Sequence, residues 1–153
     1  MKKVIVSVFL LIGFIAVLSA QIDKKAIGLR FGGLNGNGAE VSYQQPMGTN
    51  RAELDLGLHS GGFGLSGIYQ WVKPLPQLSE GFFWYYGVGA GLGFYDFNKT
   101  TTSFNLGILG QIGAEYDFEF PLQISVDYRP GIYFIPPVSP SYDGICLAVR
   151  YKF

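Results

Sequence analysis

Apolar and polar positions alternate with a period of two along the last ten residues of the chain, 144–153. The odd positions, from Ile145 to Phe153, are all apolar, whereas the even positions are small or basic. Successive side chains of a β-strand point to opposite faces, so this pattern predicts a strand with one apolar face and one polar face. Such a strand suits a barrel wall that separates hydrocarbon from a polar lumen.

Eight segments between turn signals share this alternation. They cover approximately residues 24–32, 38–45, 51–60, 63–72, 82–95, 102–117, 121–133 and 143–153. In the third segment Leu54 and Leu56 alternate with Glu53 and Asp55, and a slip of one residue would turn these carboxylates toward acyl chains. We therefore expect an all-β fold: a closed, eight-stranded, antiparallel up-and-down transmembrane β-barrel.

The fifth segment places glycines on its inward face. Gly87, Gly89, Gly91 and Gly93 alternate with outward apolar residues. These glycines leave room for large side chains in the lumen or relieve strain at a bend, and both explanations are compatible.

Two positions break the pattern. Pro130 lies inside the seventh segment, where it cannot donate a ladder hydrogen bond, so we expect a bulge near it. Ile68 falls on the polar face if Tyr69 and Trp71 face lipid. This suggests a small apolar layer within the lumen.

The first twenty residues have the features of a secretory signal peptide. Lys2 and Lys3 precede an uncharged apolar stretch, 4–18, which ends at Ser19 and Ala20. The rival interpretation is a transmembrane anchor helix, which needs about 17 residues or more. Cleavage after Ala20 would leave one domain, 21–153, and an exported chain.

Composition points in the same direction. Aromatic residues make up 16% of the chain and charged residues only 14%, below the roughly 25% of ordinary soluble domains. The formal net charge is zero, which argues against nucleic acid as a partner.

The inward faces carry five basic and five acidic residues. They are Arg30, Glu40, Arg51, Glu53, Asp55, Glu115, Asp127, Arg129, Arg150 and Lys152. An eight-stranded barrel is just wide enough to be filled by side chains, and an unpaired buried charge is costly, so we expect a lumen charge network and no open pore.

One ion pair follows from an assumed hairpin. If Phe134 pairs with Asp143, Asp127 lies opposite Arg150. This predicts a buried ion pair, although at a wet rim the same two side chains would be solvated and contribute little.

Both ends of the predicted domain lie in the periplasm when the strand number is even. The outer loops are then 33–37, 61–62, 96–101 and 134–142, and the periplasmic turns are 46–50, 73–81 and 117–120. Aromatic residues gather near the predicted strand ends, as in membrane-interface girdles. The interface aromatics are Trp71, Trp84, Tyr86, Phe94 and Tyr116.

Candidate catalytic and metal chemistry is weak. The single histidine, His59, precedes Ser60, and adjacent strand residues point to opposite faces unless a bulge intervenes. His59 with Asp55 is better explained as a rim histidine in a polar network than as an acid–base pair. Cys146 has no partner for a disulfide and is expected to be a packing residue. Metal-ligand spacing is absent, and no cofactor is expected.

Residues 149–153 and 84–94 carry a resemblance to a known family. The chain resembles the small bacterial outer-membrane β-barrel proteins, a short-looped branch of the porin-like superfamily, over its whole predicted mature length. The resemblance implies that Tyr151 and Phe153 form the assembly signal recognised by the barrel-assembly machinery. It says little about activity, because this family includes anchors, adhesins, enzymes and channels.

These observations lead to one functional expectation and three alternatives. We expect a monomeric, non-enzymatic protein of a Gram-negative outer membrane that contacts outer-membrane lipids and serves as a structural or docking component of the envelope. The alternatives are a narrow channel for ions or small hydrophobic molecules, a lipid-modifying enzyme that uses Ser60 and His59, and a soluble secreted barrel that binds a ligand.

Overall fold

A computed structural model describes residues 24–32, 38–59, 62–98, 101–134, 139–141 and 144–153. The predicted signal peptide and the predicted outer loop 33–37 lie outside these residues. The strands are β1 (Ala26–Gly32), β2 (Ala39–Met47), β3 (Asn50–His59), β4 (Gly62–Pro74), β5 (Phe82–Asn98), β6 (Thr101–Asp117), β7 (Leu122–Tyr128), β8 (Gly131–Tyr133), β9 (Ser139–Ser141) and β10 (Ile145–Lys152). Among the residues described, no helix has the length and apolar composition needed to cross a bilayer.

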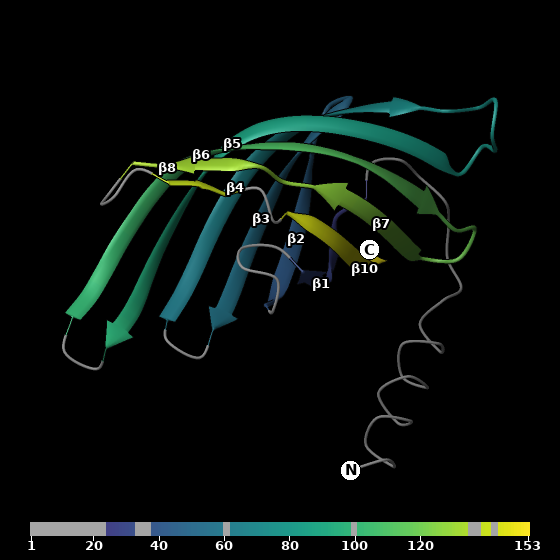
Figure 1. The fold of residues 1–153 in the computed structure, drawn as a ribbon. Coiled ribbons are helices and arrows are strands. Elements are labelled where there is room, and N and C mark those ends of the chain that lie inside the picture. The colour runs from purple at the N-terminus through teal and green to yellow at the C-terminus, as the bar shows by residue number, and fades with distance from the viewer. Residues whose placement is uncertain (1–23, 33–37, 60–61, 99–100, 135–138, 142–143) are drawn as a thin grey trace, which may run out of the picture.

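The strands close into an antiparallel barrel (Figure 1). Neighbours in sequence pair from β1 to β6, and β1 also pairs with β10, which pairs with β7. Both β7 and β8 pair with β6, and β9 pairs with β8. Within the described residues the ring therefore has eight strands, two of them interrupted, which confirms the predicted all-β, eight-stranded antiparallel fold.

The interruption between β7 and β8 lies at Pro130. Tyr128 pairs with Ile145 on β10, whereas Gly131 pairs with Ser141 on β9. Three steps along one strand thus span four steps along the other, and this register shift is the bulge that the sequence predicts near Pro130. The Pro130 carbonyl still accepts a hydrogen bond from Gly110 N–H at 2.9 Å, but its ring nitrogen cannot donate one in return.

The predicted register of the last hairpin is wrong. Asp127 pairs with Cys146, and Arg150 pairs with Gln123, so the true register differs by four residues from the one that places Asp127 opposite Arg150. Alternation specifies only whether a residue points in or out, and a shift by an even number leaves the faces unchanged. The bulge near Pro130 and the closure of the last hairpin determine which residues of the two strands pair.

The turn between β2 and β3 is shorter than the predicted turn 46–50. Strand β2 continues through Pro46, and Met47 pairs with Asn50. The two turn residues are Gly48 and Thr49, and Gly48 has φ +69°. A two-residue hairpin turn requires a positive φ at this position, which glycine adopts without steric cost.

An apolar layer lies within the lumen, as the position of Ile68 suggests. Ile68 and Leu109 are 2% and 1% exposed. A Cβ added to Gly87 would lie 2.8 Å from Ile68 Cγ2, and one added to Gly91 would lie 3.0 Å from Leu109 Cδ1. The inward glycines of β5 therefore provide the space that these two side chains fill.

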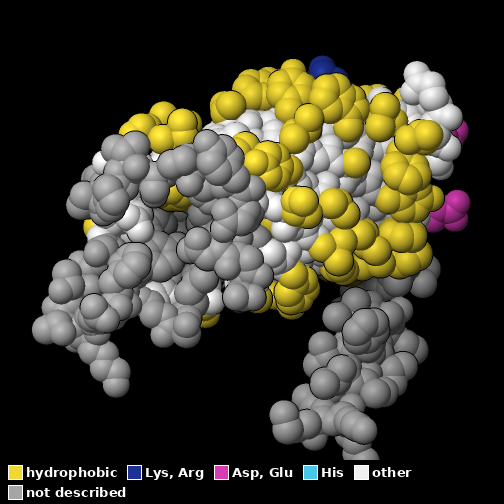
Figure 2. Space-filling view, viewed as in Figure 1, with side chains coloured by type: hydrophobic (Ala, Val, Ile, Leu, Met, Phe, Trp, Pro, Cys, Tyr) yellow, Lys and Arg dark blue, Asp and Glu magenta, His cyan; other side chains and the backbone are white. Residues whose placement is uncertain are grey.

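The outer surface of the barrel is apolar. Its exposed large side chains form an apolar belt, defined here by Ile27, Leu29, Phe31, Val41, Leu54, Leu56, Leu58, Phe63, Leu65, Tyr86, Val88, Phe94, Leu106, Ile108, Ile112, Val126, Ile132, Ile145, Leu147 and Val149. Figure 2 shows apolar side chains over much of the wall in view, with the visible charged side chains at its margins. The barrel thus has an apolar surface and a polar interior, the reverse of an ordinary soluble protein.

Candidate functional site: the lumen charge network and its vestibule

The charged residues of the lumen come from strands on opposite sides of the barrel. Arg30 and Arg150 lie on the adjacent strands β1 and β10, and Arg129 lies at the break between β7 and β8. The facing carboxylates are Glu40 on β2, Glu53 and Asp55 on β3, and Asp127 on β7. All seven residues are at most 5% exposed, and we call them the central network.

Arg30 joins two carboxylates from opposite directions. Its Nη1 lies 2.7 Å from Glu40 Oε2, and its Nη2 lies 2.5 Å from Asp127 Oδ1. The Tyr85 hydroxyl donates a further hydrogen bond of 3.1 Å to Asp127 Oδ2. The side chain of Asp127 is therefore paired with Arg30 and not with the predicted Arg150.

Arg129 spans the lumen from the β7–β8 break to β3. Its Nη2 lies 2.8 Å from Glu53 Oε1 and 2.5 Å from Asp55 Oδ2. Its Nη1 donates to Ser66 Oγ at 3.0 Å and lies 3.5 Å from Glu40. One guanidinium therefore links β2, β3 and β4 to the opposite wall.

Glu53 is the hub of the central network. Arg150 Nη2 donates to its Oε2 at 2.9 Å, and Gln44 donates to the same oxygen at 2.7 Å. Arg129 and Gln111 donate to the other oxygen, Gln111 at 3.1 Å. A carboxylate with charged and amide donors on both oxygens is tolerated away from water, because its lone pairs are satisfied.

Two further ion pairs lie nearer one end of the barrel. We call the end at which β1 begins and β10 ends the proximal end, and the opposite end the distal end. Arg51 binds Glu115 through two hydrogen bonds of 2.7 and 2.5 Å, and its guanidinium carbon lies 4.9 Å from the centre of the Tyr85 ring. Lys152 Nζ lies 2.6 Å from Asp117 Oδ2.

All ten residues assigned from the sequence to the lumen charge network take part in these contacts. The charge network predicted from the sequence did not include Asp117, although Asp117 also occupies an inward position in the alternation of its strand. It also omitted the buried uncharged donors and acceptors, which are Ser42, Gln44, Ser66, Gln70, Gln111, Gln123 and Ser125. The same inward alternation was the signal available for them.

A vestibule opens into the lumen at the proximal end. It is a cavity of about 70 Å³. Its lining residues are Lys24, Ala26, Gln44, Pro46, Gly48, Thr49, Asn50, Arg51, Val72, Phe83, Glu115, Asp117, Gln123 and Lys152. The Arg51–Glu115 pair thus belongs to the vestibule wall, and the buried central network fills the lumen further in.

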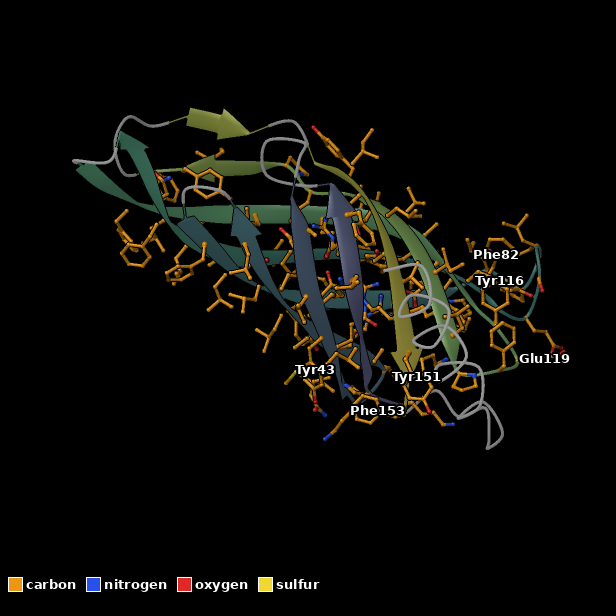
Figure 3. All side chains as sticks on the ribbon, turned by 90° about the horizontal axis from the view of Figure 1, so that it is seen from below. Tyr43, Phe82, Tyr116, Glu119, Tyr151 and Phe153 are labelled. Carbon is orange, nitrogen blue, oxygen red and sulfur yellow. The ribbon has the colours of Figure 1, made fainter. Side chains whose placement is uncertain are left out.

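The aromatic residues form groups at both ends of the barrel. Trp71 stacks on Tyr86 with ring centroids 5.3 Å apart, and Trp84 lies 5.4 Å from the same ring. Phe82 and Tyr116 form a second proximal group, close to Glu119 in Figure 3, which also shows Tyr43 near Tyr151 and Phe153. At the distal end Phe94 contacts Phe63 and Phe104, at 5.3 and 5.0 Å.

Within the described residues no group of three or more His, Cys, Asp or Glu side chains is arranged to hold a metal ion. Cys146 is buried, and its thiol lies 3.4 Å from the Gly144 carbonyl oxygen that accepts its hydrogen bond. Ser60 and the side chain of His59 lie outside the description, so their predicted opposite orientation stays a prediction.

Comparisons of the chain with protein-family models, curated proteins and solved structures found no match. The class is therefore defined by the structure itself: a closed antiparallel β-barrel with a polar, charge-paired interior and an apolar exterior.

Proposed function

We propose that the protein is a non-enzymatic integral outer-membrane β-barrel of a Gram-negative bacterium, a structural or docking component of the envelope with a lumen filled by side chains. The observation that carries this proposal is the inverted polarity. Val88 and Ile108 on the outer face are 55% and 59% exposed, whereas Arg30 and Arg150 inside are 0% exposed. Contiguous apolar surface on this scale indicates a membrane or a large partner as the surrounding medium.

The spacing of the aromatic groups supports a bilayer as that medium. On β5 the chain passes from Trp84 at the proximal end to Phe94 at the distal end. Ten steps of a strand tilted by about 40° rise roughly 25 Å along the barrel axis, close to the apolar band of outer-membrane barrels. Backbone closure supports it further, because hydrocarbon offers no partner for a free strand edge.

The filled lumen favours a structural or docking role over a channel. The central network closes the lumen with buried ion pairs between β1, β2, β3, β7 and β10. A permeating ion would have to displace a guanidinium that is held by several carboxylates. Export through a cleaved signal peptide, and recognition of Tyr151 and Phe153 by the assembly machinery, belong to this same proposal.

Spin labels test the proposal at the outer face. Single labels at Leu56 and Ile108 are expected to be accessible to oxygen dissolved in the bilayer and protected from a water-soluble nickel reagent. A label at Glu119, an exposed residue of the β6–β7 turn, serves as the matched control and is expected to show the reverse. Water accessibility at both Leu56 and Ile108 in reconstituted, heat-modifiable protein would rule out the membrane-spanning arrangement.

A further inference from the structure

We propose that the central network is a proton-binding site, in which Asp55 takes up one proton from mildly acidic solution while the other three carboxyl groups of the network stay ionised. This inference rests on the contacts inside the lumen and not on the membrane location. It therefore holds equally for the folded barrel in detergent, and it makes the stability of the barrel depend on pH.

The described part of the central network contains one more carboxyl group than guanidinium groups. Arg30, Arg129 and Arg150 face four carboxyl groups. The two ion pairs nearer the proximal end are each neutral and leave this balance unchanged. An excess charge that is closed off from water is costly, and a carboxyl group avoids the cost by binding a proton. One proton makes the central network neutral.

The hydrogen bonds identify Asp55 as the group that is least stabilised as an anion. Glu53 accepts four hydrogen bonds, spread over both oxygens, and Asp127 accepts three. Asp55 accepts one from Arg129 and a long one of 3.4 Å from Ser66, both on Oδ2. Its Oδ1 is buried and has no hydrogen-bond partner among the described residues.

Glu40 is the nearest competitor for this proton. It also accepts its hydrogen bonds on a single oxygen, from Arg30 at 2.7 Å and from Arg129 at 3.5 Å. Glu40 is 5% exposed, however, against 1% for Asp55. Ionisation therefore costs less at Glu40 than at Asp55.

A second carboxyl group lies beside Asp55. Glu53 and Asp55 both contact Arg129 Nη2, so two acidic groups share one nitrogen. Arg129 and Arg30 attract a negative charge on Asp55, whereas Glu53 and Glu40 repel it. When two carboxyl groups share a site, one of them retains a proton more readily. Because Glu53 has more donors, that proton belongs to Asp55.

The other strands next to Asp55 offer it no further charge. Its directly paired neighbours are Ser42 on β2 and Ser66 on β4. The remaining charged or titratable side chains described in the lumen have other partners: Arg150 binds Glu53, Arg51 binds Glu115, Lys152 binds Asp117, Tyr85 donates to Asp127, and Cys146 donates to the Gly144 carbonyl oxygen.

Infrared spectroscopy of the full-length folded protein in micelles detects the proton directly. A protonated carboxyl group gives a C=O band that is separate from the carboxylate bands and shifts in D2O. Wild-type protein is expected to gain one such band relative to Asp55→Asn as the pH is lowered from about 8 to about 5, a range in which ordinary Asp and Glu side chains stay mostly ionised.

Urea titration of the same two proteins measures the consequence for stability. A proton that the folded barrel binds and the unfolded chain does not stabilises the barrel at lower pH, and this stabilisation is lost as the pH rises. The ratio of the wild-type folding equilibrium constant to that of Asp55→Asn is therefore expected to fall with rising pH, by up to about tenfold per pH unit for one proton. Both proteins share every other titratable group, so the ratio reports on position 55.

Asp127→Asn is the matched control, because it removes the same charge from the same network. Arg30 then loses the carboxylate that accepts two of its hydrogen bonds. The folding equilibrium constant of Asp127→Asn should accordingly be about tenfold or more below that of Asp55→Asn throughout the pH range.

Three results would overturn the proposal. The first is a wild-type spectrum without a protonated carboxyl band that Asp55→Asn lacks. The second is a stability ratio of wild type to Asp55→Asn that does not change with pH. The third is a loss of stability in Asp55→Asn that equals the loss in Asp127→Asn, which would show that Asp55 is needed as an anion.

Discussion

At the scale of the residue, the barrel depends on how each inward side chain is accommodated. Tyr85 is fully buried and binds Asp127, and the opposite position on β6 is Gly113. A Cβ on Gly113 would lie 2.7 Å from the Tyr85 ring and 2.6 Å from Asp127 Cβ. The glycine is therefore required for a polar contact that belongs to the central network.

Replacement of Gly113 by alanine is expected to lower the free energy of unfolding by about 1 to 3 kcal/mol, because the extra methyl group overpacks a closed interior. Urea titration in micelles, followed by the heat-modifiable folded band, measures the change. Gly110→Ala on the same strand is the control, since its Cβ would meet Pro130 Cγ at an ordinary 3.7 Å. Equal losses in the two variants would contradict this account of Gly113.

The sequence could predict which residues share the lumen but not which of them pair. Alternation placed Arg30, Arg129 and Arg150 on the inward side, and burial then required partners for each. Of the two carboxylates that bind Arg30, Glu40 lies directly opposite on β2, whereas Asp127 is 97 positions away, and this second choice depends on barrel closure and strand stagger. Neither quantity is encoded in a local pattern.

At the scale of the element, the interrupted strand explains the wrong register. Pro130 removes one ladder donor, and the strand that pairs with β7 and β8 contains one additional residue at that level. The sequence signals the irregularity through Pro130, yet the length of the opposite strand that it shifts cannot be read from alternation. Strands β1 to β6 are each continuous, with one register shift between Asp96 and Asn98 near the end of β5, and their predicted positions lie close to the observed ones.

A disulfide distinguishes the two registers. Val126 and Leu147 are directly paired, both point outward, and they occupy a closely spaced position because Arg129 N–H donates to Gly144 across the same ladder. In a Cys146→Ser background, Val126→Cys with Leu147→Cys is expected to oxidise readily, as shown by a mobility shift under non-reducing conditions.

The comparison variant is Val126→Cys with Tyr151→Cys, which would be opposite each other in the register that pairs Phe134 with Asp143. This second pair should remain reduced. Preferential oxidation of the Tyr151 pair would show that the observed register of β7 and β10 is incorrect.

At the scale of the whole molecule, an apolar belt surrounds an ion-paired interior. The alternation of apolar and polar residues predicted the all-β class, the number of strands and the inward-facing residues. It could do so because each side chain of a closed barrel points either inward or outward. The vestibule did not follow from it. Its lining comes from eight strands, from the turn between β2 and β3, and from the residue Lys24 that precedes β1, so only the closed structure brings Lys24, Val72 and Glu115 to one cavity.

Because side chains fill the lumen, we expect the protein not to conduct ions. Purified wild-type protein in planar bilayers is expected to give no stable single-channel openings, because the Arg30, Arg129 and Arg150 guanidiniums are held by buried carboxylates. Heat modifiability of the same preparation shows that the protein is folded. Reproducible openings of the folded form would favour the narrow-channel alternative instead.

Cys146 is the single thiol of the chain, and this residue is 1% exposed near the start of strand β10. A maleimide can reach the thiol only when β10 and its neighbouring strands move apart, so the rate of alkylation reports how often the barrel opens locally. The alkylation rate of this native cysteine therefore measures transient opening of the barrel without an added probe.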